Sequence, residues 1–270
     1  MTSRATSFGA VAAAYERFRP GYPDELVDLV LDYAGQPVRT ALEIGAGTGK
    51  ATRAFAARGI AVTATDPDAA MLTELRRHVP DTVTVRQGTL EQLDQPDDLD
   101  PAGGFDLVFA AAALHWTDPA TRWSRISRLL GSRGVFASFG GPMDLADPDL
   151  DATVADITRP YLGGDHHIPA PDGTAADSAM QWPGSELLTV SGFTDIRQET
   201  IARAVPLSRD DFIGHLGTIS AYLQLPQRDR AEVLEQVRAV LPARVTLRAD
   251  LIVHLARLTA PVGRAPRPAS

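Results

Sequence analysis

The fold is decided by Thr40-Ala41-Leu42-Glu43-Ile44-Gly45-Ala46-Gly47-Thr48-Gly49, an apolar run that passes into alternating glycines. The first half predicts the end of a buried strand, because the run is apolar and is stopped by glycine. Glycine tolerates positive φ and carries no Cβ, so the backbone of such a turn can lie against a ligand with its amide groups pointing outward. We therefore expect a strand, a ligand-binding turn and a helix over residues 50–58.

The spacing of the glycines separates two nucleotide-type ligands. A dinucleotide fingerprint, G-x-G-x-x-G, would need glycine at position 50, where the chain has Lys50. The pattern present, E-x-G-x-G-x-G, resembles motif I of the class I S-adenosylmethionine (SAM) methyltransferases. The resemblance implies that Glu43 helps to place the cationic amino-acid end of SAM. It also implies that the turn packs against the ribose and methionine part through Gly45, Ala46, Gly47, Thr48 and Gly49.

A second signal of a nucleotide-type site is the stretch Ile60-Ala61-Val62-Thr63-Ala64-Thr65-Asp66. It is an alternating β-rich run that ends in a carboxylate. The acid lies roughly 20 residues beyond the turn, where this fold class places its ribose-binding residue. A carboxylate can accept both ribose hydroxyls, whether the ligand is NAD or SAM. The continuation resembles the methyltransferase segment D-x-x-x-x-M-L, which implies that Pro67 and Met71 cover the adenine. Asp66 can also be read as a helix N-cap with Pro67 at the first helical position, and both roles can hold together.

The N-terminal segment predicts two helices around a turn. Helical spacing runs over Phe8–Arg19, and a second helix is expected from Asp24 as its N-cap to Tyr33. The segment Tyr15–Pro23 resembles the Y-x-x-x-R-P-x-Y-P entrance of small-molecule methyltransferases related to trans-aconitate methyltransferase. The resemblance implies that Tyr15 and Arg19 border the SAM pocket and that Tyr22 faces the substrate. Otherwise the two tyrosines are core aromatics and Arg19 caps a helix end.

The third strand, expected over Thr82–Arg86, leads to Gln87-Gly88-Thr89-Leu90-Glu91. The related enzymes usually carry G-D-A-E-x-L here, and the aspartate accepts a hydrogen bond from the adenine amino group. Thr89 stands in place of that aspartate. The resemblance then implies that the Thr89 hydroxyl and the Leu90 amide reach the adenine, without the charge.

A fourth strand is expected over Phe105–Ala113, a nearly all-apolar run typical of a central parallel strand. Its continuation Leu114-His115-Trp116 resembles the family ending A-x-x-x-H-W. The resemblance implies that carbonyls near Ala111 contact the methionine amine and that Leu114 and Trp116 line the cofactor pocket. An aromatic face beside a sulfonium cation contributes about 0.5–2 kcal/mol. His115 is then either a base that titrates near neutral pH or a structural residue of the strand end.

The repeats from Thr40 to Phe139 predict the fold class. A helix over residues 123–130 and a fifth strand over Gly134–Phe139 complete five β/α units, which favour an α/β doubly wound sheet. The resemblance implies a mostly parallel, seven-stranded, Rossmann-like sheet with helical cap insertions. We expect an N-terminal helical cap over 1–34 and a SAM-binding core over 35–140. The rest of the same domain would span 141–260, followed by a disordered tail over 261–270.

Beyond residue 140 the chain predicts a cap and the last two strands. Strands are expected over Phe193–Ile201 and Val245–Leu258. Helices are expected over 150–161, 210–224 and 228–241, and the apolar faces of the later ones suit a lid. Asp165-His166-His167 invites a metal site, but adjacent side chains rarely converge on one ion, so a mobile loop is the better interpretation and no metal is expected. Substrate contacts are expected from His167, Phe212 and Tyr222.

Composition limits the partners. The chain has 270 residues, 44% of them hydrophobic, a formal net charge of −8, a pI near 5.2 and no cysteine. An acidic chain repels a phosphate backbone, and the D/N-P-P-Y/F/W turn of base N-methylating enzymes is missing after the fourth strand, so no nucleic-acid partner is expected. With neither a span of about 20 apolar residues nor a signal peptide, we expect a soluble cytoplasmic monomer or homodimer without membrane partners.

The sequence therefore predicts a SAM-dependent methyltransferase that acts on a small molecule, a carboxylate or a natural-product scaffold of secondary metabolism, by in-line methyl transfer. S-Adenosylhomocysteine (SAH) would be the product. A second interpretation keeps the SAM site but turns it to a non-methylating reaction such as cyclisation, or to binding alone. A third is an NAD dehydrogenase.

Overall fold

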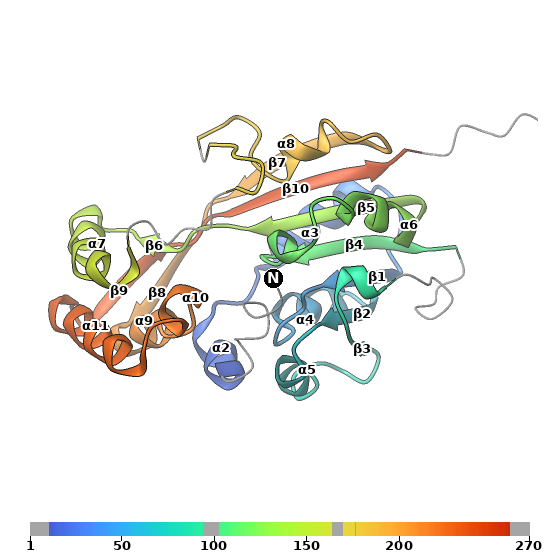
Figure 1. The fold of residues 1–270 in the computed structure, drawn as a ribbon. Coiled ribbons are helices and arrows are strands. Elements are labelled where there is room, and N and C mark those ends of the chain that lie inside the picture. The colour runs from blue at the N-terminus through green and yellow to red at the C-terminus, as the bar shows by residue number, and fades with distance from the viewer. Residues whose placement is uncertain (1–10, 94–102, 164–169, 176, 260–270) are drawn as a thin grey trace, which may run out of the picture.

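A computed structural model describes residues 11–93, 103–163, 170–175 and 177–259. Within these residues, a seven-stranded sheet forms the main body (Figure 1). Its strands, in spatial order, are β3 (Thr84–Gln87), β2 (Ala61–Asp66), β1 (Thr40–Ile44), β4 (Phe105–Ala111), β5 (Leu130–Gly140), β10 (Leu251–Leu258) and β7 (Phe193–Ile201).

The first five strands are parallel, and β10 runs antiparallel to both β5 and β7. This confirms the predicted doubly wound, mostly parallel sheet of seven strands. Ile44 at the end of β1 pairs with Thr65 on one side and with Ala110 on the other. The turns that follow β1, β2 and β4 therefore emerge together at one edge of the sheet, the place where such folds bind ligands.

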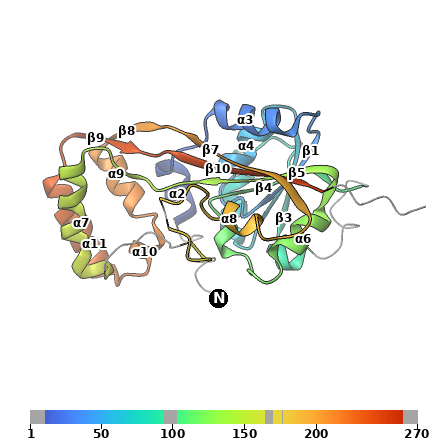
Figure 2. The ribbon, with the colours of Figure 1, turned by 90° about the horizontal axis from the view of Figure 1, so that it is seen from above.

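Helices cover both faces of the sheet, as Figure 2 shows from above. One apolar cluster joins α3 (Asp24–Ala34), α4 (Lys50–Ala56) and α5 (Ala69–Leu75) to the strands. A second cluster, on the other face, joins α6 (Arg122–Leu129), α8 (Gly184–Leu187) and the short turn η2 (Leu90–Gln92). Burial on both faces explains why the central strands read as nearly continuous apolar runs.

A second lobe stands beside the main sheet, on the left in Figure 1. We use this name for a three-stranded antiparallel sheet of β6 (Asp144–Leu145), β9 (Arg244–Arg248) and β8 (Ala204–Ser208), together with four helices. The helices are α7 (Pro148–Leu162), α9 (Arg209–Leu216), α10 (Ser220–Leu223) and α11 (Gln227–Val240). The lobe has an apolar core of its own, separate from the two clusters of the main sheet.

The predicted final strand over Val245–Leu258 is wrong as a single element. The chain bends at Ala249 and Asp250, so β9 pairs within the second lobe and β10 within the main sheet. The bend is held because the Asp250 carboxylate accepts the Arg203 amide at 2.8 Å and the Ala249 amide bonds to the Arg203 carbonyl at 2.8 Å. A Cβ on Gly141 would lie 2.1 Å from the Asp250 carbonyl oxygen, so this crossing also needs glycine.

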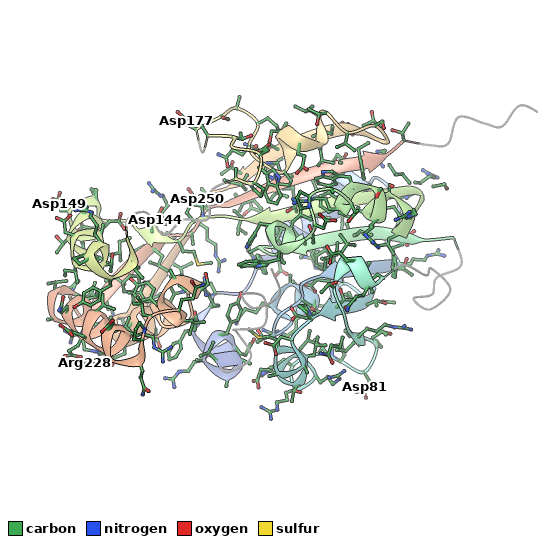
Figure 3. The ribbon with its side chains drawn as sticks, viewed as in Figure 1. Asp81, Asp144, Asp149, Asp177, Arg228 and Asp250 are labelled. Carbon is green, nitrogen blue, oxygen red and sulfur yellow. The ribbon has the colours of Figure 1, made fainter. Side chains whose placement is uncertain are left out.

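Three neighbouring strands of the main sheet thus continue into the second lobe: β5 into β6, β10 into β9 and β7 into β8. Their connecting residues form the junction, which we define as residues 141–143, 202–203 and 249–250. Asp250 is labelled at this junction in Figure 3. Because β5 enters the junction from its carboxyl end, the second lobe grows from the same edge of the sheet as the ligand-binding turns.

The helix α2 (Ala12–Phe18) contacts both parts of the molecule, packing against α5 and against α9. A Cβ on Gly214 of α9 would lie 2.6 Å from the Phe18 ring, so the two helices approach closely there.

Asp24 is the first residue of α3 and Pro23 its N-cap, which corrects the expected cap. Phe8, the 165–167 segment and the C-terminal tail lie outside the described residues. No helix in the described ranges combines the length and apolarity that a membrane crossing requires.

Candidate functional site

An open cavity lies at the carboxyl edge of β1, β2, β3 and β4. Its empty space, which includes open solvent, is about 820 Å³. Ten residues predicted to bind the cofactor line it: Tyr15, Gly45, Gly47, Asp66, Pro67, Met71, Thr89, Leu90, Ala111 and Trp116. We call it the donor cavity.

Each of the three glycines in the turn after β1 is needed for a different reason. Gly45, Gly47 and Gly49 all have positive φ, at 68°, 55° and 83°. A Cβ on Gly45 would lie 2.4 Å from the Ala113 Cβ, so Gly45 lets β1 and β4 close on each other. A Cβ on Gly49 would meet Leu75 at 2.8 Å, which makes Gly49 a packing residue for α5 outside the donor cavity. Around Gly47 a Cβ would find no atom within 4 Å, because this glycine faces open space.

Asp66 lies at the end of β2, within the donor cavity. One carboxylate oxygen accepts the Gly47 amide at 2.9 Å and the other accepts the Asp68 amide at 2.8 Å. Asp66 is 8% exposed. Its burial raises its pKa to about 6, although the two hydrogen bonds act to lower it. Its expected role as helix N-cap is wrong, because Asp68 caps α5 by accepting the amides of Ala70 and Met71. The side chain of Asp66 is left to hold the turn and to meet a ligand.

We predict that Asp66→Asn weakens SAH binding by roughly tenfold or more at pH 8, because a charged acceptor is replaced by a neutral amide. Since the pKa of Asp66 is raised to about 6, the free wild-type carboxyl is mostly protonated at pH 5, where one acceptor site is lost. The ratio of wild-type to variant affinity should therefore fall from pH 8 to pH 5. Calorimetric titration with SAH at both values measures this ratio, and a constant ratio would contradict the role of the carboxylate.

Glu43 lies beneath the turn, not on the wall of the donor cavity. It is 1% exposed and one of its oxygens accepts the Thr52 hydroxyl at 2.5 Å, while the other is buried without a partner in the described residues. Burial raises the pKa of Glu43 to about 8 and nearby Asp66 adds to the rise, against the hydrogen bond from Thr52. The group is thus largely uncharged at neutral pH until a cation comes near it.

The wall expected to face adenine is formed by Pro67, Met71, Thr89 and Leu90. Thr89 is the N-cap of η2, where its hydroxyl oxygen accepts the Gln92 amide and its own amide bonds to the Gln92 side chain at 2.9 Å. The hydroxyl proton of Thr89 keeps its donor capacity for a ligand. Met71 is held by α5 with its side chain almost fully buried against the main sheet.

Trp116 and His115 lie side by side after β4, with ring centroids 4.5 Å apart, but they face different surroundings. Trp116 is 36% exposed and lines the donor cavity. His115 is outside the lining, and its Nε2 is buried without a partner among the described residues. Burial, with a smaller effect of Arg122, lowers the pKa of His115 to about 4. In the ligand-free chain the ring is therefore a neutral, weakly basic imidazole, which argues against a base that titrates near neutral pH.

We predict that His115→Ala lowers turnover less than about tenfold, since general-base catalysis contributes about 10²–10⁴-fold and this ring neither reaches the donor cavity nor titrates near pH 7. The initial rate of SAH formation at saturating SAM measures the effect. A drop beyond 100-fold with unchanged SAH affinity would restore His115 as a base.

Other predicted site residues are placed away from the donor cavity. Ala46, Thr48 and Leu114 are buried in the framework behind it, and Arg19 and Tyr22 lie beside it, at the junction. Phe212 and Tyr222, expected to contact substrate, are 3% and 0% exposed in the core of the second lobe, so they have no surface to offer a ligand. His167 lies outside the described residues. No group of three His, Cys, Asp or Glu side chains could hold a metal ion in the described part of the chain.

The sequence interpretation missed several lining residues: Ile44, Gly88, Ala112, Ala113 and Thr117. Ala112 has a φ of 52°, a left-handed conformation that an alanine rarely adopts. Its amide bonds to the Phe139 carbonyl at 2.8 Å, which holds the strained residue at the end of β4. Nothing in a run of alanines signals this conformation, although backbone strain of this kind often marks a ligand site.

The donor cavity suits an adenosyl ligand better than a dinucleotide. Lys50, at the position where a dinucleotide turn needs its third glycine, begins α4 and bonds through Nζ to the Glu16 carbonyl at 2.6 Å. The Asp66 carboxylate, the Gly47 backbone and the Trp116 ring all line one cavity. They provide a ribose acceptor, room for close approach and an aromatic face for a cation.

Comparison with known proteins agrees with this geometry. Residues 42–138 match the family model for a methyltransferase domain. An uncharacterized methyltransferase of Mycobacterium tuberculosis is 41% identical over 128 residues, which is 47% of this chain and 49% of that protein. A Dictyostelium discoideum protein assigned as a methyltransferase is 25% identical over 87% of this chain and 84% of its own length. The chain spans about half the length of the first curated relatives it matches.

Among solved structures, a protein of Anaeromyxobacter dehalogenans assigned to the type II methyltransferases superposes with a TM-score of 0.61 at 25% identity. The match covers 89% of this chain and 98% of that one. The sheet order, the turn after β1 and the acid after β2 define a nucleotide-cofactor protein of the Rossmann-like type. Over residues 42–138 the chain matches a methyltransferase domain, and its fold is similar to that of a protein assigned to the methyltransferases.

Proposed function

We propose that the protein transfers a methyl group from SAM to a small molecule. The observation that carries the proposal is the donor cavity itself, in which the Asp66 carboxylate, the open side of Gly47 and the exposed Trp116 ring meet at one edge of the sheet. The match of residues 42–138 to a methyltransferase domain supports SAM as the donor.

Bound SAM would supply an activated methyl group on a sulfonium cation. The residues of this chain mainly bind and orient. Asp66 would accept ribose hydroxyls, Gly47 admits the ligand to the backbone, and Trp116 offers a face to the positive charge. Alignment alone can contribute effective molarities of about 10⁵ M or more. No residue lining the donor cavity is placed as a strong base, which fits an acceptor that needs little deprotonation.

The acceptor is proposed to be a small molecule because the second lobe grows from the same edge of the sheet as the donor cavity. The lobe continues from β5, β10 and β7, and α2 connects it to α5 beside the cavity. Because the chain is acidic, we propose a metabolite or a natural-product scaffold as its acceptor in preference to a nucleic acid. We extend the proposal to the branch of small-molecule methyltransferases that the Tyr15–Pro23 segment resembles.

The test has a binding step and a turnover step. Calorimetry with SAM, SAH and NADH identifies the cofactor, and SAH formation in the presence of candidate acceptors reports methyl transfer. SAH binding together with acceptor-dependent SAH formation would support the proposal. Tight SAH binding without turnover on any of a broad acceptor panel would favour a non-methylating role, and NADH binding without SAM binding would overturn the cofactor assignment.

A further inference from the structure

Two arginines reach the same turn from different parts of the chain. Arg19 follows α2, three residues before Tyr22, and Arg203 lies in the junction between β7 and β8. Arg203 donates through Nη1 to the Gly21 carbonyl at 2.7 Å, which places its guanidinium beside the backbone of Tyr22. Arg19 bonds to Thr218 of the second lobe, and both guanidinium groups act electrostatically on Tyr22.

Neither arginine has an acidic partner in the part of the chain that the structure describes. Arg19 donates to the Thr218 hydroxyl at 2.9 Å and to the Thr218 carbonyl at 3.3 Å, both neutral acceptors. Asp250 lies close to Arg203 but accepts its backbone amide, at 2.8 Å, and not its guanidinium. A guanidinium has five N–H donors, so each group keeps several for another acceptor.

Two other enclosed arginines in the described chain have acidic partners, whereas Arg209 and Arg257 bond to backbone carbonyls. Arg53 pairs with Glu16 at 2.7 Å, and Arg122, which is fully buried, pairs with Glu186 at 3.6 Å. Placing a charged group in a half-buried position without a partner of opposite charge is unfavourable. The presence of two such guanidinium groups, those of Arg19 and Arg203, near Tyr22 therefore calls for a physical reason. His215 supplies no compensating charge, because burial and the nearby Arg19 lower its pKa to about 3 and keep it neutral.

Arg19 lies next to a residue of the donor cavity, where the methyl donor is proposed to bind. Tyr15 lines the donor cavity, and its ring centroid is 5.4 Å from the Arg19 guanidinium carbon. Burial raises the pKa of the Tyr22 hydroxyl, and Tyr15 and Glu43 add to the rise, while Arg19 and Arg203 act to lower it. The hydroxyl of Tyr22 thus lies within the field of both arginines and next to the aromatic wall of the donor cavity.

We propose that Arg19 and Arg203, assisted by the Tyr22 hydroxyl, bind an oxyanion of the methyl acceptor, either a carboxylate or a phosphate. The inference rests on the proposed methyl transfer and names the substrate class for it. Planar guanidinium groups match carboxylate and phosphate oxygens in pairs, which explains arginine at both positions. The chain has a formal net charge of −8 and repels anions in general. Two guanidinium groups without acidic partners would therefore direct an anionic acceptor to this one site.

The experiment measures anion binding to the full chain saturated with SAH, at constant ionic strength. The probes are citrate, inorganic phosphate and the neutral triethyl citrate. Wild type should bind citrate or phosphate, and Arg19→Gln and Arg203→Gln should each weaken that binding by roughly tenfold or more. Arg203→Lys should retain part of it. Arg228→Gln is the control, because Arg228 is exposed on the second lobe, away from the junction (Figure 3).

The outcomes separate this inference from the proposed function. Unchanged SAH affinity and unfolding temperature in the arginine variants would show that they are folded. If wild type binds SAH but neither anion, or if Arg228→Gln weakens the anion as much as Arg203→Gln, the oxyanion site is overturned while methyl transfer stands. If wild type does not bind SAH at all, the proposed function itself fails.

Discussion

Replacing Gly47 with valine is expected to weaken SAM and SAH binding by at least about 100-fold, a loss of about 2.7 kcal/mol. Gly47 lines the donor cavity, and a Cβ built on it meets no atom within 4 Å because the space in front of it belongs to the cavity. A valine side chain would fill that space. The Gly47 amide also donates to Asp66, so a shift of the turn would disturb the ribose acceptor as well.

Gly59→Val provides a matched control for backbone strain. Gly59 has a φ of 78°, against 55° for Gly47, and a Cβ there also meets nothing within 4 Å, but this exposed residue lies outside the donor cavity. Both variants place a β-branched residue in the left-handed region and should lose similar stability. Only Gly47→Val should lose the ligand, as measured by calorimetric titration. If the two variants bound SAH equally well, the assignment of the turn to an adenosyl ligand would collapse.

The donor side of the site could be predicted because its signals are local. The glycine turn and Asp66 stand at strand ends, and the parallel order of the strands brings strand ends together at one edge. The apolar runs of β1 and β4 show burial on both faces without any knowledge of partners. These features depend on spacing along the chain, which a sequence displays directly.

The acceptor side could not be predicted because it depends on where the chain bends. β9 and β10 read as one alternating strand, and only the polar Asp250 marks the break between them. Arg203 and Arg19 are far apart in sequence, and both act on Tyr22 only because that bend builds the second lobe beside α2. The same limit explains Phe212 and Tyr222, whose apolar helix faces suited a lid but form a separate core.

Local ambiguity caused the remaining errors. The segment Asp66-Pro67-Asp68 offers two carboxylates for one helix cap, and a pattern cannot tell which of them turns toward the amides of α5. The role of Glu43 toward the cofactor stays a prediction: its side chain is directed to Thr52 beneath the turn, and its second oxygen has no partner among the described residues. Burial of that carboxylate, which no sequence pattern reports, has a consequence for stability that can be measured.

Glu43→Gln is expected to remove a pH dependence of stability in the ligand-free protein. The pKa of Glu43 is raised from its ordinary value of 4.5 to about 8 in the folded chain, so the folded state binds the proton more tightly than the unfolded state. This stabilisation is complete below pH 4.5 and is lost as the pH rises through 8. Between these values the wild-type free energy of unfolding should fall by up to about 1.4 kcal/mol per pH unit.

The clean window for this measurement is pH 7 to 8. The raised pKa of Asp66 is about 6, and the lowered pKa values of His115, His215 and His254 are about 4 or below, so none of these groups titrates there in the folded state. Denaturant unfolding of wild type and Glu43→Gln across this window gives both slopes. Glutamine keeps an acceptor for the Thr52 hydroxyl, so the variant should match wild type at or below pH 4.5 and exceed it by a growing margin up to pH 8. Saturating SAM should flatten the wild-type slope if its cationic end ionises Glu43 in the complex. Equal slopes for the two free proteins would mean that Glu43 carries its charge in the folded state, and its burial would then need a cation that the described residues do not supply.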